Sequence, residues 1–152
     1  MSTVTLEAVK TKQTELAAMI AALEANAKRL VVFPCAEIQL NEGEHYAGII
    51  TGKDGEPGHH LILLPEEIEK SGWDIAIKWA KNGIGQLPTR REQALLYANL
   101  KGQFQPSWYW SCEQHASHSD YVWVQHLNVG HQYVSLKSAE WLARAVRRLP
   151  ID

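Results

Sequence analysis

The sequence predicts an α+β domain that is preceded by an N-terminal coiled-coil helix. Two observations lead to this prediction: a heptad pattern through the first 30 residues, and a glycine-rich hairpin followed by short helices and then by several apolar strand segments. Strands and helices that come in separate runs are typical of antiparallel sheets with the helices on one side. We therefore expect an oligomerising helix over residues 1–30 and one compact domain over residues 31–152.

The first segment spaces its apolar residues alternately by three and four, as at the a and d positions of a coiled coil. Alanines between them favour a helix, and no glycine or proline interrupts the pattern. We expect this helix to join copies of the chain into a dimer or a trimer; an amphipathic helix that lies on its own domain is the alternative. The predicted seam consists of Leu6, Val9, Gln13, Leu16, Ile20, Leu23, Ala27 and Leu30.

The first half of the domain is predicted to consist of strands. Residues 30–33 form an apolar strand that Pro34 ends. Residues 44–51 and 59–64 flank a loop with three glycines and a proline, which predicts a hairpin with a mobile tip. The acidic residues 65–70 are expected to form a short turn of helix.

Two helices are predicted next. The first begins at Trp73 and ends at Asn82-Gly83, because a glycine beyond the last turn readily takes positive φ. The second begins at a capping box, in which the side chains of Thr89 and Glu92 bind each other's backbone amides, and ends at Lys101-Gly102.

The remaining residues are predicted to be mostly strand. The densest aromatic run, Trp108-Tyr109-Trp110, is followed by apolar segments at residues 121–127 and 132–136. The last segment, residues 141–149, is ambiguous from its residues alone, because its apolar positions have helical spacing.

Composition and charge exclude several classes of function. The formal net charge of −2 attracts neither nucleic acid nor an anionic membrane, although the end of the chain is locally basic. Cys35 and Cys112 are too few for a disulfide framework, and we expect two reduced thiols. There is no signal peptide, and no stretch approaches the roughly 20 apolar residues of a bilayer span. We therefore expect a protein of the cytoplasm, or of a virion, without membrane insertion and without a nucleic-acid partner.

One candidate site is chemical. Cys112, His115 and His118 are separated by two residues each, a spacing that allows a zinc site or a thiol enzyme with Cys112 as nucleophile. The Ser/His-rich residues 115–120 are more simply an exposed loop, without the paired ligand knuckles of zinc modules. We therefore expect no metal, no cofactor and no catalytic residue, and keep a metal- or thiol-dependent enzyme as the alternative function.

The other candidate site is a binding surface made of aromatic and neutral polar side chains. Such side chains suit a sugar, a nucleobase or a protein, because they provide contact area and directional hydrogen bonds without a large cost of charge desolvation. About half of the aromatic residues are expected in the core, and the polar loops 113–120 and 125–132 are expected to carry recognition. The predicted ligand-binding residues are Trp108, Glu113, Gln114, His115, His118, Tyr121, Gln125, His126 and His131.

Five short motifs follow one another in this chain: Trp73, Ala76 and Trp79-Ala80; Leu87-Pro88-Thr89 with Glu92 and Leu95-Leu96; Trp108-Tyr109-Trp110-Ser111; Val122-Trp123-Val124; and Arg144-Ala145-Val146-Arg147. Their order over residues 72–149 resembles the Lcl C-terminal domain family, which is named after a bacterial collagen-like adhesin and is common in bacteria and phages. The resemblance implies a C-type-lectin-like fold, a domain that is not an enzyme, and a final strand through residues 145–147. The chain departs from the family at Gly85-Gln86, where the family has Trp-Arg, and at Cys112-Glu113, where it has Ser-Thr.

The expected function follows from the helix and the resemblance together. We expect a homo-oligomeric binding protein without enzymatic activity, encoded by a phage or prophage, whose linked copies bind a repeated target with a gain in avidity. The target is expected to be a glycan, a nucleotide-like small molecule or a host protein. Receptor binding and capture of a host-defence factor both fit.

Overall fold

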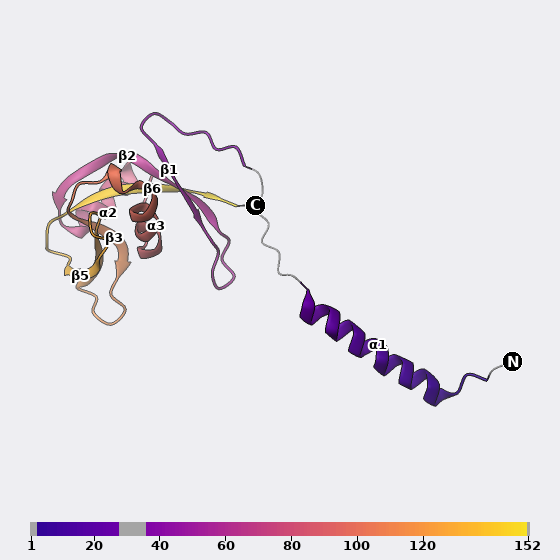
Figure 1. Ribbon diagram of the computed structural model, residues 1–152. Coiled ribbons are helices and arrows are strands. Elements are labelled where there is room, and N and C mark those ends of the chain that lie inside the picture. Colours follow the sequence, from indigo (N-terminus) through magenta and orange to yellow (C-terminus); the bar gives the residue numbers. More distant parts are fainter. Residues whose placement is uncertain (1–2, 28–35, 152) are drawn as a thin grey trace. The chain divides into compact units, whose positions relative to one another are not determined.

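The computed structural model describes residues 3–27 and 36–151 of the chain (Figure 1). The chain divides into two compact units, residues 1–35 and 36–152. The strand predicted at residues 30–33 lies outside the described residues, as do Leu30 of the predicted seam and Cys35. No described helix has the length and apolarity that crossing a membrane requires.

The first unit contains helix α1 (Leu6–Asn26), as predicted. Thr5 caps this helix, because its hydroxyl accepts a hydrogen bond from the backbone N–H of Ala8 at 3.2 Å. None of the residues of α1 is buried. The helix is therefore confirmed, whereas its pairing with other copies stays a prediction. The large apolar side chains exposed in this unit are Val4, Leu6, Val9, Leu16, Met19, Ile20 and Leu23.

The second unit is a mixed α+β domain built on a six-stranded sheet (Figure 1). The strand order is β1-β2-β6-β3-β4-β5, so the last strand of the chain lies between the hairpin β1–β2 and the strands β3, β4 and β5. Neighbouring strands are antiparallel except β3 and β6, which pair in parallel at Tyr109 and Leu142, so the expectation of purely antiparallel sheets was wrong there. The strands are β1 (His45–Ile50), β2 (His59–Ser71), β3 (Trp108–Gln114), β4 (Tyr121–His126), β5 (Gln132–Leu136) and β6 (Trp141–Pro150).

Strand β2 extends beyond its predicted end. Residues 65–70 belong to it, and the turn of helix predicted there was wrong. These residues pair with β6, for example at Glu67 with Arg144. The pairing register shifts between Leu63 and Glu67, around Pro65, because proline has no N–H to donate. The pairing satisfies backbone groups that an isolated acidic turn would leave to water, so a distant strand overrides the local preference.

Strand β6 resolves the ambiguity of the last segment in favour of the extended form that the resemblance implied. Its side chains alternate between the two faces of the sheet. Ala143 and Ala145 join one core cluster, and Val146 joins another. Since both faces of the strand are apolar, its sequence shows no strict alternation of apolar and polar residues, and local spacing could not identify it.

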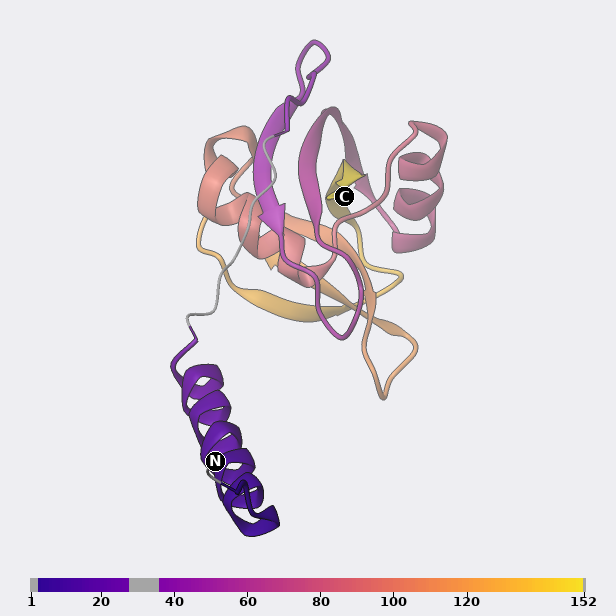
Figure 2. The same ribbon diagram turned by 90° about the vertical axis from the view of Figure 1, so that its right-hand side faces the viewer.

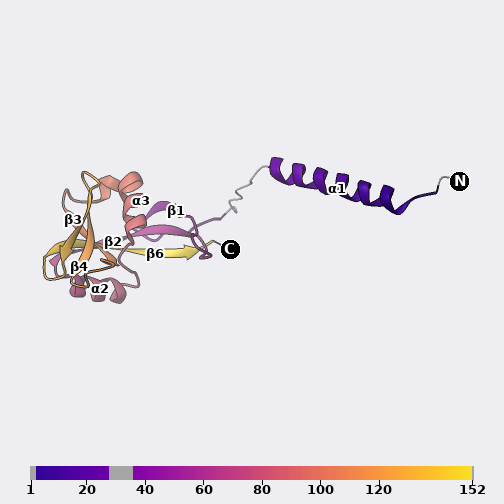
Figure 3. The ribbon, with the colours of Figure 1, turned by 90° about the horizontal axis from the view of Figure 1, so that it is seen from below.

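Helices α2 (Trp73–Asn82) and α3 (Arg90–Leu100) lie on opposite faces of the sheet (Figures 2 and 3). α2 packs Trp73 and Ala76 into the cluster that contains Ala143, and α3 packs Leu96 into the cluster that contains Val146. The expectation that the helices share one side was wrong, because both faces of this sheet are apolar and each requires a cover.

The predicted capping box at the start of α3 is present. The Thr89 hydroxyl accepts a hydrogen bond from the Glu92 N–H at 3.2 Å, and the Glu92 carboxylate accepts one from the Thr89 N–H at 2.8 Å. At its other end, α3 stops at Leu100, next to the predicted stop at Lys101-Gly102, and a 3₁₀ turn, η1 (Lys101–Gln103), follows directly. The start of α3 is thus fixed by local chemistry, and this start forms part of the candidate site.

The segment before α3 packs closely at Gly85. A Cβ atom at Gly85 would lie 2.6 Å from Leu64 Cδ1 and 3.0 Å from the Val146 carbonyl oxygen. A larger side chain at this position would require Leu64 to move. The next residue, Gln86, forms a bridge with Val146 through both backbone groups, at 2.8 and 3.0 Å.

Candidate functional site

A wide groove with a volume of about 1060 Å³ opens at the N-terminus of α3. Its walls come from the β1–β2 hairpin, the first turns of α3, strand β3, the β4–β5 region and the end of β6. Most of the lining side chains are polar or charged. They include Lys53, His59, Arg90, Arg91, Glu92, Cys112, Glu113, Gln125, Gln132 and Arg148.

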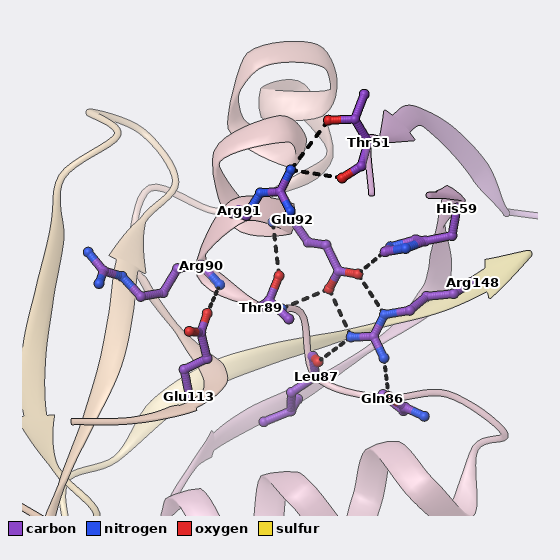
Figure 4. A network of polar contacts seen from close by, with 10 residues as sticks. All are labelled: Thr51, His59, Gln86, Leu87, Thr89, Arg90, Arg91, Glu92, Glu113 and Arg148. Atoms are coloured by element: carbon purple, nitrogen blue, oxygen red, sulfur yellow. Dashed lines mark hydrogen bonds and ion pairs between the residues drawn. The ribbon is translucent and has the colours of Figure 1, made fainter. Parts of the chain in front are cut away.

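Glu92 lies at the base of the groove and is fully buried (Figure 4). Its carboxylate accepts hydrogen bonds from the Arg148 guanidinium at 2.6 and 2.9 Å and from His59 Nε2 at 2.7 Å, in addition to the Thr89 N–H. Burial raises the pKa of this carboxyl, but the bonds from Arg148 and Thr89 outweigh burial, and the pKa lies below its usual value. Glu92 is therefore ionised and fully occupied, so it links α3 to β2 and β6 and offers no free oxygen to a ligand.

Arg90 and Arg91 precede Glu92 in α3 and line the groove, and their side chains point away from each other (Figure 4). The Arg91 guanidinium donates to the Thr51 carbonyl oxygen at 3.0 Å, and Arg90 Nε donates to Gln132 Oε1 at 3.0 Å. Neither guanidinium forms an ion pair with a carboxylate among residues 3–27 and 36–151. Each one therefore keeps N–H donors for a further acceptor, and its planar fork matches a carboxylate or a phosphate.

Glu113, one of the predicted ligand-binding residues, reaches the N-terminus of α3 from strand β3. Its Oε2 accepts a hydrogen bond from the Arg90 backbone N–H at 2.5 Å (Figure 4). A carboxylate is stabilised there, because the first N–H groups of a helix have no partner within the helix and the helix dipole is positive at this end. The side chain thus has a structural partner as well as a place in the groove.

A row of stacked side chains leads from the groove along β4. The Arg90 Cζ atom lies 3.5 Å from the centroid of the Trp123 ring, and the His115 ring stacks on Trp123 at 6.0 Å. The His118 ring lies 5.1 Å from His115 and 6.2 Å from Tyr121. We call Arg90, Trp123, His115, His118 and Tyr121 the aromatic row. It brings together three of the predicted ligand-binding residues.

The other predicted residues do not join one surface. Gln125 is buried at the groove, whereas Trp108 and His126 pack edge to face at 5.2 Å on the face of the sheet that α2 covers. Gln114 is exposed at the end of β3, and His131 is exposed beside β5. Consecutive strand residues such as Gln125 and His126 point to opposite faces, so loops were the wrong interpretation for the parts of 113–120 and 125–132 that are strand.

Five aromatic side chains that were expected to divide about equally between core and surface differ in their burial. Trp110 is fully buried, and its indole N–H donates to the Ser71 carbonyl oxygen at 2.8 Å. Trp108 and Trp123 are half-buried. Tyr121 and Tyr133 are exposed. Of these five side chains, only Trp123 and Tyr121 contribute to the aromatic row.

Sequence reasoning missed the groove residues His59, Arg90, Arg91 and Arg148. Arg90 and Arg91 carried a usable signal, because two arginines in the first turn beside a capping box project from a known place in the fold. Arg148 carried a weaker signal. Its partner Glu92 is 56 residues away, and no local pattern connects the two.

Cys112 lies in strand β3 and has a free thiol. Burial raises the pKa of this thiol, and the nearby Arg148 offsets that only in part. The reactive thiolate is therefore disfavoured. In the described part of the chain, no three His, Cys, Asp or Glu side chains gather closely enough to hold a metal ion, so Cys112, His115 and His118 do not form the ligand set that their spacing allowed.

No protein-family model matches the chain, and no curated protein matches it either. The resemblance to the Lcl C-terminal domain family therefore stays a prediction. The groove and the aromatic row are the features from which a function can be argued.

Proposed function

We propose that this chain is a homo-oligomeric binding protein without enzymatic activity, whose groove takes a small anionic ligand of the nucleotide type. The observation that carries the proposal is that Arg90 and Arg91 both line the groove and that no carboxylate neutralises either guanidinium among the described residues. Arginine binds phosphate and carboxylate groups through paired N–H donors. The groove, at about 1060 Å³, is as large as the upper end of the range for small-molecule sites, roughly 300–1,000 Å³.

The balance of charge in the groove supports an anion over a neutral sugar. Glu92 offsets Arg148, and Glu113 is bound to the N-terminus of α3. Lys53, Arg90 and Arg91 then stand against Glu56 and Glu113 as the remaining charged side chains of the lining, which leaves one excess positive charge. Positive charge in a concave site raises the local concentration of anions and speeds their association.

One aromatic side chain, Tyr97, is among the described residues that line the groove, and Gly130 packs against its ring. A Cβ atom at Gly130 would lie 2.7 Å from Tyr97 Cε1, and the residue has φ of +81°, so glycine is required there for two reasons. Arginine side chains and a tyrosine ring in one lining suit the two parts of a nucleotide, a phosphate and a base.

Helix α1 supports the oligomeric part of the proposal. Apart from Gln13, the a and d side chains within α1 are apolar and exposed, and burying them against other copies would remove that surface from water. Two or three linked grooves would then bind a repeated or multimeric target with higher avidity than one. Dimer and trimer are both compatible with the seam.

The fold and the biological setting complete the proposal. A hairpin, two helices and a further set of strands in this order support a C-type-lectin-like domain of the Lcl type, together with the five motifs. Such a domain in a phage or prophage protein would capture a nucleotide-like signal of the host. Recognition of a surface glycan and recognition of a host protein are the alternatives, and the test below separates the glycan.

The ligand is tested by isothermal titration calorimetry of the full chain with adenosine 5′-monophosphate, with adenosine as the uncharged control and N-acetylglucosamine as the glycan control. We expect the monophosphate to bind and both controls to bind at least about tenfold more weakly, as loss of a charged hydrogen bond implies. Arg91→Gln should weaken binding about tenfold and change the free energy of unfolding by less than about 0.5 kcal/mol.

The matched control for Arg91→Gln is Lys70→Gln, which removes one exposed positive charge that does not line the groove. It should leave the affinity unchanged. Binding of N-acetylglucosamine without binding of the monophosphate would favour a glycan as the ligand. Absence of any binding, or equal binding by the Arg91→Gln variant, would contradict the proposed groove.

Oligomerisation is tested by light scattering of the full chain. Leu16→Lys combined with Ile20→Lys places charges in the seam and should convert a dimer or trimer into monomers. The control Ala18→Lys adds a charge to the same helix outside the seam and should keep the oligomer. A monomeric parent chain would remove avidity from the proposal but would leave the groove untouched.

A further inference from the structure

A second, smaller pocket lies on the opposite face of the sheet, beside α2. Its volume is about 240 Å³, and its walls are the turn at residues 41–44, the stretch of β2 around Pro65, the end of α2 and Ala145 of β6. It shares no lining residue with the groove. What it binds is therefore independent of the function proposed above.

One side of this pocket is apolar and aromatic. Trp79 of α2 lines it while half-buried, and Leu64 and Ala145 complete that side. The face of an indole ring carries partial negative charge and attracts cations within about 6 Å of its centroid. Tryptophan is the best of the aromatic side chains for this contact.

The rim of the pocket is acidic. It carries Glu42, Glu44 and Glu66, and none of the described residues that line it is a lysine or an arginine. Arg147 neutralises Glu44 from outside the lining, with two nitrogens at 2.8 Å from the carboxylate oxygens. Glu42 and Glu66 form no ion pair with a described residue, so the pocket has an excess of negative charge next to its indole wall.

The turn that carries Glu42 is held in one shape. The Glu44 carboxylate accepts hydrogen bonds from the Asn41 N–H at 2.8 Å and from the Asn41 side-chain amide at 3.2 Å. Gly43 has φ of +76°, and a Cβ atom there would lie 2.8 Å from Pro65 Cβ. The turn therefore packs directly on the other wall, and the pocket is formed before any ligand arrives.

We propose that this pocket binds an organic monocation, an alkylammonium or a guanidinium group, with its charge near Glu42 and Glu66 and its alkyl stem against Trp79. The combination of an aromatic wall with carboxylates favours a cation that also has apolar surface. A volume of about 240 Å³ lies below the usual range for drug-sized ligands, so it admits the end of one side chain or a small amine. A metal ion would need three close ligands, and the described residues do not gather three.

The test follows the Trp79 indole N–H in two-dimensional NMR spectra of the full chain, with Trp79→Phe to assign its signal. The probes are n-butylammonium and n-butylguanidinium, with n-butanol as the uncharged control of equal stem length. We expect both cations to shift the Trp79 signal to saturation and n-butanol to leave it in place. The peptide acetyl-Gly-Lys-Gly-amide then tests whether the cation comes from a protein side chain or from a free amine. The peptide should bind if the pocket takes a lysine side chain of a partner protein. It should not bind if only a free amine fits.

The carboxylates are tested by combining Glu42→Gln with Glu66→Gln, both exposed positions, and by Glu69→Gln as the control on the same strand as Glu66 but outside the pocket. The double variant should bind n-butylammonium about fivefold more weakly, and the control should bind as the parent does. The proposal is overturned if n-butanol binds as well as n-butylammonium, if neither cation gives a saturable shift, or if the double variant keeps the parent affinity.

Discussion

Arg147 and Arg148 are neighbours on β6, yet they serve opposite faces of the sheet. Arg147 pairs with Glu44 on the face that α2 covers, and Arg148 pairs with Glu92 on the face that α3 covers. Both pairs are bidentate, and the two guanidinium groups are exposed to similar extents, 23% and 26%. The difference lies in what each glutamate holds together.

Glu92 lies deep beneath α3 and connects three elements, since His59 of β2, Arg148 of β6 and the cap of its own helix all bind it. The Glu44 side chain is also nearly inaccessible, 4% exposed, but fewer protein atoms surround it, and it connects a short turn to β6. The same pair chemistry therefore supports the base of the groove on one face and the rim of the small pocket on the other. Removing one partner should cost more at the Glu92 pair, because more of the protein surrounds Arg148 than Arg147 and the charge that is left is less well solvated.

The largest effect is expected from Glu92→Gln. This change keeps the shape of the side chain, removes its charge and leaves Arg148 without its ion pair. Breaking a buried pair in this way should lower the free energy of unfolding by about 3 kcal/mol. Urea denaturation of the full chain, followed by far-ultraviolet circular dichroism, measures it.

The same variant also tests whether Glu92 supports the fold or takes part in ligand binding. If Glu92 holds α3 in place, the loss of stability should appear with and without a ligand in the groove. A variant as stable as the parent would show that the pair with Arg148 contributes little, and the contrast between the two faces would fail.

A smaller loss is expected from Glu44→Gln. The turn at residues 41–44 keeps the hydrogen bond from the Glu44 N–H to the Asn41 carbonyl oxygen at 3.1 Å, and Arg147 regains water at little cost. The free energy of unfolding should fall by about 1 kcal/mol, measured by the same urea titration. A loss equal to that of Glu92→Gln would mean that depth of burial does not separate the two pairs.

The smallest effect is a dependence on pH that belongs to Glu44. Its hydrogen bonds to Arg147 lower the pKa of the carboxyl from 4.5 to about 2, against the opposing effect of burial. Because the folded pKa is the lower one, the unfolded chain binds the proton first, and the stabilisation is complete above about pH 5 and lost as the pH falls towards 2. The difference in unfolding free energy between the parent and Glu44→Gln, about 1 kcal/mol at neutral pH, should therefore shrink towards zero over this window.

Urea titrations at a series of pH values measure this difference directly. Glu92, whose pKa is also lowered, changes the stability of both proteins in the same direction and cancels in the comparison. A difference that stayed constant down to pH 2 would show that Glu44 is not stabilised by its charge.

The sequence predicted best those features whose determining residues lie close together in the chain. Thr89 and Glu92 are three residues apart, and their capping box was predicted and is present. The prediction for residues 65–70 was wrong because the strand that pairs with them lies at the far end of the chain. In the candidate site, His115, His118 and Tyr121 lie close in sequence and do meet in the aromatic row, whereas Trp108 and His126 were assigned to the same surface and lie on the other face.

Local sequence patterns specify helix α1, the hairpin, the start of α3 and the mixed α+β class, because propensity, turns and caps act between residues a few positions apart. The position of β6 between β2 and β3, and the placement of α2 and α3 on opposite faces, depend on long-range contacts. That order places Arg148 over Glu92 and opens the groove beside Arg90. The physical reason is that strand pairing and burial are satisfied between distant segments, and a local pattern does not specify which segment its partner will be.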